Sequence, residues 1–381
     1  MRPWPALRFS VAAAALLATT ALGCASNRSM PGHSDTAEMR DSATAAQLAV
    51  QLDSLRRANG IPGLAIAVLR DTTILLARGF GLSDVARSVA VTPETPFNIA
   101  SVSKPISAVV ALRLVEQYAL DLDRSMRRYR AFPEFCEAVR LEGGIFFDDY
   151  ACEGDHLTMR HVLSMTANGT PGTRFYYNPV SYSWASRPMA EATGRAFSSL
   201  VDSLVFRPAQ MRRSARIHRA LPLRADLAAD LAKPYHLDAT GHPVLSDPPP
   251  PQGDGAAGGV ISTAMDLARF DIALTQGRLL SSASREQMWT PGRAPSGDVL
   301  PYGLGWFVAD VAGRRLVWHT GLWEGRYSAL YVKVPADRLT LILLANSEGL
   351  QWENRLDEAA IERSPFARAF LAAFPSVPPR P

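Results

Sequence analysis

The eight residues Phe97–Lys104, FNIASVSK, lead into the strongly apolar run Ile106–Leu122. The run predicts a helix that begins close to Ser101 and Lys104. Residues three apart on a helix share one face, so the hydroxyl of Ser101 and the amine of Lys104 can touch. A serine hydroxyl is a weak nucleophile until a base takes its proton, and a lysine whose pKa is lowered by burial can serve as that base. The stretch therefore predicts a nucleophilic serine with a lysine partner, and the helix N-terminus favours the negative charge that develops there.

Outward from this stretch, strand-like runs lie at both ends of the chain and helices lie between them. Residues rich in β-formers on either side of Arg70-Asp71-Thr72 read as a hairpin. The segment Asp123–Pro251 mixes helices and loops. Beyond it, four β-rich runs predict an antiparallel meander: Tyr302–Val308, Arg314–Trp318, Arg326–Val334 and Leu339–Leu344. We expect an α/β (α+β) fold, in which one antiparallel sheet is built from both chain ends, flanked by helices and joined to an inserted helical lobe.

The N-terminal residues have the pattern of a secretory signal. Val11–Leu22 is almost wholly apolar behind Arg2 and Arg8, and it is too short to span a membrane with normal flanks. It ends in Ala21-Leu22-Gly23-Cys24, which resembles a bacterial lipobox, so residues 1–23 are expected to be removed and Cys24 to carry lipid. The alternative is an ordinary signal peptide cut after a small residue. We expect an exported protein of the cell envelope, anchored to the membrane by this lipid, on the periplasmic side if the host has two membranes.

The remaining chain divides into three parts. Residues 24–45 are small and polar and are expected to form a flexible tether. Residues 46–363 are expected to form a single domain that begins with a helix over Ala45–Asn59 and ends with one from about Trp352 to Arg363. Residues 364–381 are expected to be a proline-rich tail.

Charge and cysteine usage exclude several classes of partner. The net charge is only +4 and the charged residues are interspersed, so nothing indicates a nucleic acid partner. Apart from Cys24, the chain has Cys136 and Cys152, which an oxidising compartment would allow to join as a disulfide. Zinc binding is the alternative, but no CxxC or HxxxH pattern lies near them. We predict no metal and no cofactor.

The stretch FNIASVSK resembles the nucleophile motif of the serine β-lactamase and penicillin-binding superfamily. Gly63–Val68, Leu157–Gly169, Gly258–Leu267 and Tyr302–Trp306 are similar to segments of its class C-like branch, which includes D-alanyl-D-alanine carboxypeptidases and esterases. The resemblance spans about Leu48 to Gly349. It implies a β-lactamase/transpeptidase-like fold and hydrolysis through an acyl-enzyme on Ser101.

The second motif of that superfamily is Tyr-x-Asn, matched here by Tyr176-Tyr177-Asn178. The resemblance implies that Tyr176 shuttles protons and that Asn178 holds the substrate and the lysine. Its members usually have one residue between a preceding phenylalanine and this tyrosine, whereas Tyr176 directly follows Phe175. Tyr177 with a shifted loop is therefore the alternative.

The third motif, Lys/His-Thr-Gly, is matched by His319-Thr320-Gly321. By resemblance these residues bind substrate, and the N–H groups of Leu322 and Ser101 form the oxyanion hole. A histidine supplies less constant positive charge than a lysine, which weakens binding of a β-lactam carboxylate. Trp323 and Glu324 add bulk and negative charge near the mouth of the site.

We therefore expect a serine hydrolase that acts on an ester or a peptide or amide carbonyl of a small-molecule or peptidoglycan-type substrate. A class C-like β-lactamase is the alternative within the same chemistry. An inactive or slowly turning over penicillin-binding scaffold or sensor is the alternative of another class. The joint presence of five residues argues against a decayed site: Ser101, Lys104, Tyr176, Asn178 and His319.

Overall fold

A computed structural model describes residues 33–144, 146–150, 152, 155–250, 252–352 and 359–375 of the chain. The expected signal peptide and Cys24 lie outside the described residues.

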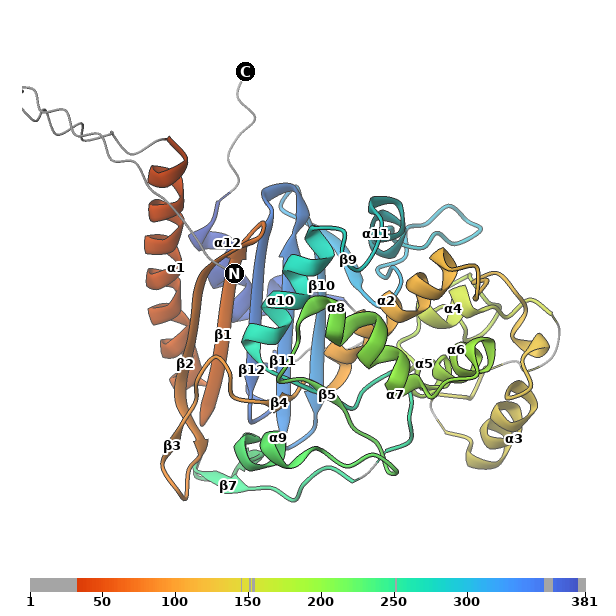
Figure 1. Ribbon diagram of the computed structural model, residues 1–381, viewed down its shortest axis with the longest axis horizontal. Helices are drawn as coiled ribbons and strands as arrows, with labels where there is room; N and C mark the ends of the chain where they lie inside the picture. Colours follow the sequence, from red (N-terminus) through yellow and green to blue (C-terminus); the bar gives the residue numbers. More distant parts are fainter. Residues whose placement is uncertain are drawn as a thin grey trace, which may run out of the picture.

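An antiparallel sheet at the centre of the molecule joins the two ends of the chain (Figure 1). In the described part of the chain its strand order is β3-β2-β1-β12-β11-β10-β9. The central pairing aligns Leu64 with Ala345 and Arg70 with Leu339. Nearly every side chain of the three central strands is buried, as expected of a sheet covered on both faces. The strands are β1 (Gly63–Arg70), β2 (Thr73–Asp84), β3 (Val89–Ala90), β9 (Phe307–Val311), β10 (Arg314–Trp323), β11 (Tyr327–Val334) and β12 (Leu339–Ala345).

Helices cover the sheet. α10 (Ala264–Thr275) crosses in front of the strands in Figure 1 and contacts β1 and β12. The first and last helices, α1 (His33–Ala58) and α12 (Pro365–Ala373), pack against each other, and α1 also packs on β1 and β2. The arrangement confirms the expected fold class, an antiparallel sheet built from both chain ends with helices around it.

Helices extend past both ends of the domain expected from sequence. Helix α1 begins at His33, so residues 33–45 of the expected tether are helical. The predicted helix from about Trp352 to Arg363 is wrong over the residues that are described, because Ile361–Arg363 form only a 3-10 turn, η5. Part of the expected tail is instead α12, which Ser364 caps by accepting a hydrogen bond from the N–H of Ala367 and which buries Phe366 and Phe370. Residues 376–381 lie outside the described part.

A helical lobe lies beside the sheet, on the right in Figure 1. Within it Cys136 and Cys152 form a disulfide with their Cα atoms 5.7 Å apart. The bridge stands next to an aromatic cluster in which the rings of Phe135 and Tyr150 meet edge to face at 5.2 Å. The elements of the lobe are η2 (Met126–Arg128), α3 (Phe132–Glu142), α4 (Met159–Leu163), α5 (Pro179–Trp184), α6 (Ser186–Thr193), α7 (Phe197–Val201), η3 (Asp202–Phe206) and α8 (Arg207–Ala209).

Two small sheets and five further elements complete the described fold. A three-stranded sheet has the order β4-β8-β5, and it is the platform from which the Ser101 segment starts. These elements are β4 (Phe97–Asn98), η1 (Ala100–Val102), α2 (Ser103–Glu116), β5 (Ala215–Arg216), α9 (Ala225–Asp230), β6 (Tyr235–Leu237), β7 (Pro243–Leu245), β8 (Val260–Ser262), α11 (Ser282–Trp289) and η4 (Pro335–Asp337).

Candidate active site

Ser101 stands on a tight turn between a buried strand and a buried helix. Strand β4 ends at Asn98, whose Oδ1 accepts a hydrogen bond from the N–H of Ala100 at 2.9 Å. Ala100 has φ +45°, a left-handed conformation that costs energy for a residue with a Cβ. The chain then enters η1 and α2, so the Ser101 side chain is presented at the start of a helix, as the sequence predicted.

Lys104 is the direct partner of Ser101. Its Nζ lies 2.7 Å from Ser101 Oγ and 3.1 Å from the carbonyl oxygen of Ala257. The lysine is fully buried, and no carboxylate among the described residues pairs with it. Burial lowers its pKa from 10.5 to about 7, because a charged amine loses its hydration there. A large share of Lys104 is therefore neutral near pH 7 and able to accept the serine proton.

The structure brings Tyr177, not Tyr176, to this pair, and so corrects the sequence-based preference. The Tyr177 phenol lies within hydrogen-bonding reach of the Ser101 side chain, and Lys104 Nζ is 5.1 Å from the centre of its ring. Tyr176 instead stacks against the guanidinium of Arg174 at 5.1 Å. The extra residue that separates Phe175 from Tyr177 restores the spacing typical of the second motif. Burial raises the pKa of Tyr177 well above 10, so this phenol stays protonated at neutral pH.

Asn178 has a structural role, which corrects the expectation that it holds substrate. Its Oδ1 accepts a hydrogen bond from the N–H of Ser181 and so caps helix α5. Its Nδ2 donates to the carbonyl oxygen of Phe146 and to Oδ1 of Asn168. With Tyr177 in the tyrosine position, the residue two places on is Pro179, and Pro179 rather than Asn178 lines the cleft.

His319 is fully buried beneath the cleft and does not line it, which corrects its assignment to substrate binding. Its Nδ1 donates to the carbonyl oxygen of Thr320 at 2.6 Å, and its Nε2 accepts from the hydroxyl of Tyr302 at 2.8 Å. Burial, together with the charge of Lys104, holds the pKa of His319 well below 6.5. The imidazole is therefore neutral and supports the wall of aromatic rings rather than offering charge to a substrate.

The rest of the third motif does border the cleft. Thr320 and Leu322 on β10 line it, and no described residue accepts from or donates to the Thr320 hydroxyl. Gly321 lies where a Cβ would come within 2.3 Å of the carbonyl oxygen of Ile99, so only glycine allows β10 to approach the Ser101 turn this closely. This contact sets the distance between the backbone of Leu322 and that of Ser101.

Sequence reasoning did not find Arg216, a buried cation in the cleft wall. Its guanidinium donates to four backbone oxygens, three of them in the glycine-rich stretch Gly253–Gly259. The same stretch supplies the carbonyl oxygen of Ala257 that holds Lys104. The closely spaced glycines could have indicated a backbone segment that approaches other groups closely. Nothing near Arg216 in the sequence, however, distinguishes it from the other arginines.

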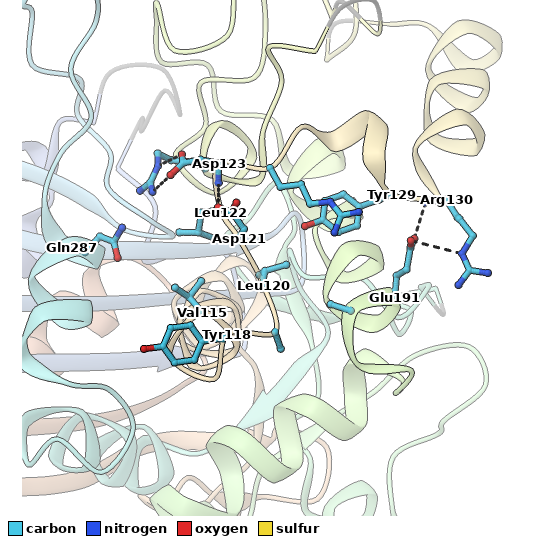
Figure 2. Close-up of a pocket in the computed structure, with 14 residues that line it drawn as sticks. Val115, Tyr118, Leu120, Asp121, Leu122, Asp123, Tyr129, Arg130, Glu191 and Gln287 are labelled. Carbon is cyan, nitrogen blue, oxygen red and sulfur yellow. Dashed lines mark hydrogen bonds and ion pairs between the residues drawn. The ribbon is translucent and has the colours of Figure 1, made fainter.

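The cleft around these residues has a volume of about 590 Å³. A larger cavity, of about 650 Å³, lies at the opposite end of α2, about 21 Å of helix away, and Figure 2 shows its lining. We call it the distal cavity; none of the candidate catalytic residues lines it. The catalytic cleft is lined by Ala100, Ser101, Lys104, Tyr177, Pro179, Val180, Ser183, Arg216, Gln252, Gly253, Gly255, Ala257, Gly258, Thr320, Leu322, Trp323 and Glu324.

Within the described residues there is no cluster of three or more His, Cys, Asp or Glu side chains that could hold a metal ion. In the same residues, no helix combines the length and apolar character needed to span a membrane.

Ser101 lies at the start of a helix in contact with the buried Lys104, Tyr177 lies beside both, and strand β10 lies opposite them. This arrangement defines a serine hydrolase of the acyl-transfer type. The sequence model of the family described as Beta-lactamase matches residues 45–364, and the chain belongs to this family. The resemblance seen in the sequence is thereby confirmed, as is the expectation of an enzyme of the serine hydrolase class.

The relatives that this chain resembles carry the names of different activities. Penicillin-binding protein 4* of Bacillus subtilis (strain 168) is 28% identical over 75% of this chain and 69% of its own. A D-aminopeptidase of Brucella canis is 25% identical over 76% of this chain, which spans only 57% of that enzyme. The solved D-amino acid amidase of Ochrobactrum anthropi SV3, in complex with L-phenylalanine amide, shares the fold with a TM-score of 0.65 and 20% identity, over 86% of this chain and 99% of the amidase.

Proposed function

We propose that the protein hydrolyses an ester or a peptide or amide bond through an acyl-enzyme on Ser101, with Lys104 as the base. The observation that carries this proposal is the 2.7 Å contact between Ser101 Oγ and the Nζ of a lysine whose pKa is lowered to about 7. A base near its own pKa at the working pH combines a useful neutral fraction with a useful proton affinity.

In the first half-reaction Ser101 Oγ attacks the substrate carbonyl carbon, and its proton passes to the neutral amine of Lys104. The negative charge on the carbonyl oxygen is accepted by the N–H groups of Ser101 and Leu322. When the C–O or C–N bond breaks, the proton returns from Lys104 to the leaving group. Tyr177, which stays protonated, relays it by donating its own proton as it receives one from the amine.

In the second half-reaction water takes the place of the leaving group. The proton of this water passes through the Tyr177 hydroxyl to Lys104, the hydroxide attacks the acyl carbon, and the proton returns to Ser101 Oγ as the acid departs. The chemistry requires no metal or redox group, since every proton and electron pair moves between the substrate, water and these side chains.

Of the activities expected from the sequence, an esterase fits this site better than a D-alanyl carboxypeptidase-like enzyme or a β-lactamase, because the substrates of the latter two carry a free carboxylate. The cations in the cleft wall are Lys104 and Arg216, and four carbonyl oxygens already occupy the guanidinium of Arg216. His319 is neutral and lies below the wall. A free carboxylate on a β-lactam or a peptide end therefore finds little fixed positive charge, and a neutral ester or amide is the favoured substrate.

The test uses the protein without residues 1–25, a fluorescent penicillin and p-nitrophenyl butyrate, with the Ser101→Ala variant in parallel. We expect labelling or ester turnover in the wild type and a loss of at least about 1,000-fold in Ser101→Ala. Turnover that survives in Ser101→Ala contradicts the assignment of the nucleophile. A folded wild type that is neither labelled nor active supports the scaffold alternative, and labelling without turnover supports a slow-turnover sensor.

We also propose that the chain is exported and anchored to the membrane by lipid on Cys24. The lipobox-like residues and the Cys136–Cys152 bridge support this proposal, since structural disulfides persist in oxidising compartments. In a bacterial host the full chain should sediment with membranes and Cys24→Ser should be released to the soluble envelope fraction. Equal release of both forms would favour an ordinary signal peptide.

A further inference from the structure

A second cavity adjoins the catalytic cleft behind Trp323. Its volume is about 250 Å³, and two residues, Gln252 and Trp323, line both spaces. We call it the side cavity. Its lining comes from the loop after β5, the proline run before the glycine-rich stretch, and the sheets on either side. The lining residues are Asn98, Ile217, His218, Arg219, Leu221, Pro222, Leu223, Leu231, Pro248, Pro249, Pro250, Gln252, Gly259, Ile261, Trp323 and Tyr327.

The wall of the side cavity is mainly apolar, and its basic side chains are exposed or have partners. Arg219 is exposed, so its charge stays in water. His218 accepts a hydrogen bond from the N–H of Ala220, and its other ring nitrogen lies 3.9 Å from Asp254. Desolvating a charged group in such a space is costly, whereas an apolar group gains from leaving water.

A buried asparagine stands in the wall of the side cavity. Asn98 lines the cavity and is buried, and no described residue accepts a hydrogen bond from its Nδ2. Its Oδ1 is the acceptor that holds the N–H of Ala100, next to Ser101. Asn98 in the wall of the side cavity is thus only three residues along the chain from the nucleophile, and the side cavity meets the catalytic cleft at Gln252 and Trp323.

The size of the side cavity sets the size of its occupant. An apolar protein cavity of about 150 Å³ is enough to bind benzene. A space of about 250 Å³ therefore admits a phenyl ring or a chain of several carbon atoms.

We propose that the side cavity is a substrate subsite that takes an uncharged apolar group of the ester or amide whose carbonyl lies at Ser101. This proposal rests on the proposed function and adds to it a substrate class: carbonyl compounds with one bulky apolar arm. Either the acyl group or the leaving group supplies this arm, and the two sources are distinguished by varying them separately.

The first experiment measures kcat/KM for two ester series. One lengthens the acyl chain from p-nitrophenyl acetate to the octanoate, and the other holds the acetyl group and enlarges the alcohol from ethyl to benzyl. We expect about a fourfold gain for each added CH₂ in one series until the cavity is full. A gain confined to the acyl series assigns the cavity to the acyl group, and a gain confined to the alcohol series assigns it to the leaving group. No gain in either series overturns the proposal.

A variant that fills the side cavity tests whether the gain in kcat/KM comes from binding there. Leu223→Trp adds a ring to the wall and should remove most of the gain while leaving acetate hydrolysis within about twofold. Leu245→Trp is the matched control, since Leu245 is 61% exposed on β7 and lines neither cavity. A gain that persists in Leu223→Trp overturns the proposal.

A binding measurement separates failure of the subsite from failure of the proposed catalysis. Ligand-observed NMR of butylbenzene should show saturable binding to the wild type and to Leu245→Trp, and loss of binding in Leu223→Trp. Binding with this pattern in a protein without esterase activity supports the subsite and rejects the proposed function. Binding that Leu223→Trp does not weaken rejects the subsite.

Discussion

The catalytic cleft and the distal cavity lie at opposite ends of the same helix, α2, and they hold their charged groups differently. In the distal cavity Arg160 forms two hydrogen bonds with Asp123, and Arg130 contacts Glu191 (Figure 2). In the cleft, Lys104 is fully buried, and no carboxylate of the described residues pairs with it. The distal cavity is the larger of the two, yet none of the candidate catalytic residues lines it.

The comparison shows that the volume of a cavity does not identify the catalytic site. A buried amine that has no oppositely charged partner does identify it. The bond to Arg160 lowers the pKa of Asp123, which keeps that carboxylate charged and inert over the ordinary pH range. Burial alone lowers the pKa of Lys104 to about 7, which places its titration where it is useful. The predictions below test this contrast in order of decreasing effect.

The largest effect is expected from Lys104→Met. Without the base, kcat/KM should fall by at least about 1,000-fold, nearly as much as in Ser101→Ala, because the two residues act as a unit. The same variant should be more stable below pH 7. Between pH 7 and 10.5 the unfolded chain binds more protons at Lys104 than the folded protein, so the cost of this lysine is fully present below pH 7 and disappears as the pH rises through 10.5.

Urea unfolding at pH 6 and pH 10 measures this second part. We expect Lys104→Met to gain about 1–3 kcal/mol at pH 6, once the lost hydrogen bonds to Ser101 and Ala257 are included, and to gain nothing at pH 10. If Lys104→Met lost the same unfolding free energy at pH 6 and pH 10, burial would not destabilise the charged amine.

The next effect distinguishes the two adjacent tyrosines. Tyr177→Phe removes the phenol beside Ser101 and should lower kcat by about 100- to 1,000-fold, the range for loss of a group that transfers protons. Tyr176→Phe keeps the ring that stacks on Arg174 and should stay within about threefold of the wild type. The steady-state kinetics of both variants on p-nitrophenyl butyrate decide the matter, and the reverse order of effects would restore Tyr176 as the catalytic residue.

A smaller effect concerns pH. Because only neutral Lys104 accepts the serine proton, kcat/KM should rise about tenfold per pH unit up to about pH 7 and then level off. His319 should add no second step near pH 6.5, since its pKa is held well below that value. A profile that is flat from pH 5 to 9 would exclude Lys104 as the titrating base.

The smallest effect is expected in the distal cavity. Asp123→Asn breaks the ion pair with Arg160, but the side chain of Asp123 is 63% exposed, and exposed pairs contribute about 0–1 kcal/mol. We expect unfolding free energy to change within that range and kcat/KM to stay within about twofold. A large loss of activity would show that the two ends of α2 are coupled and that the contrast between the cavities is incomplete.

The parts of the site that depend on local spacing were predictable. Ser101 and Lys104 are three apart at a helix start, and the alternating strands of the meander determined the sheet. The choice between Tyr176 and Tyr177 depended on how a loop of unusual spacing is threaded, and periodicity carries no information on that point. Asn178 was misassigned because the same side chain that can hold a substrate can also cap a helix.

Other features depended on contacts distant in sequence. Burial of His319 follows from its packing between rings such as Tyr302 and Phe307. Arg216 donates hydrogen bonds to a loop about forty residues further along the chain, and no local sequence pattern predicts such long-range bonds. The residues of α12 were predicted to be part of a tail because prolines surround them. Their apolar side chains form a helix face that is buried by packing against α1, a contact that the local sequence does not show.

The pairing of β1 with β12 also determines when the protein can fold. Residue 64 finds its partner at residue 345, so the two central strands of the sheet cannot join until nearly the whole chain has been synthesised. Long-range strand pairing is slow, because a long loop must close before the contacts repay it. The hairpin of β1 and β2 therefore forms without its β12 neighbour, and the sheet closes only after the last strand has arrived.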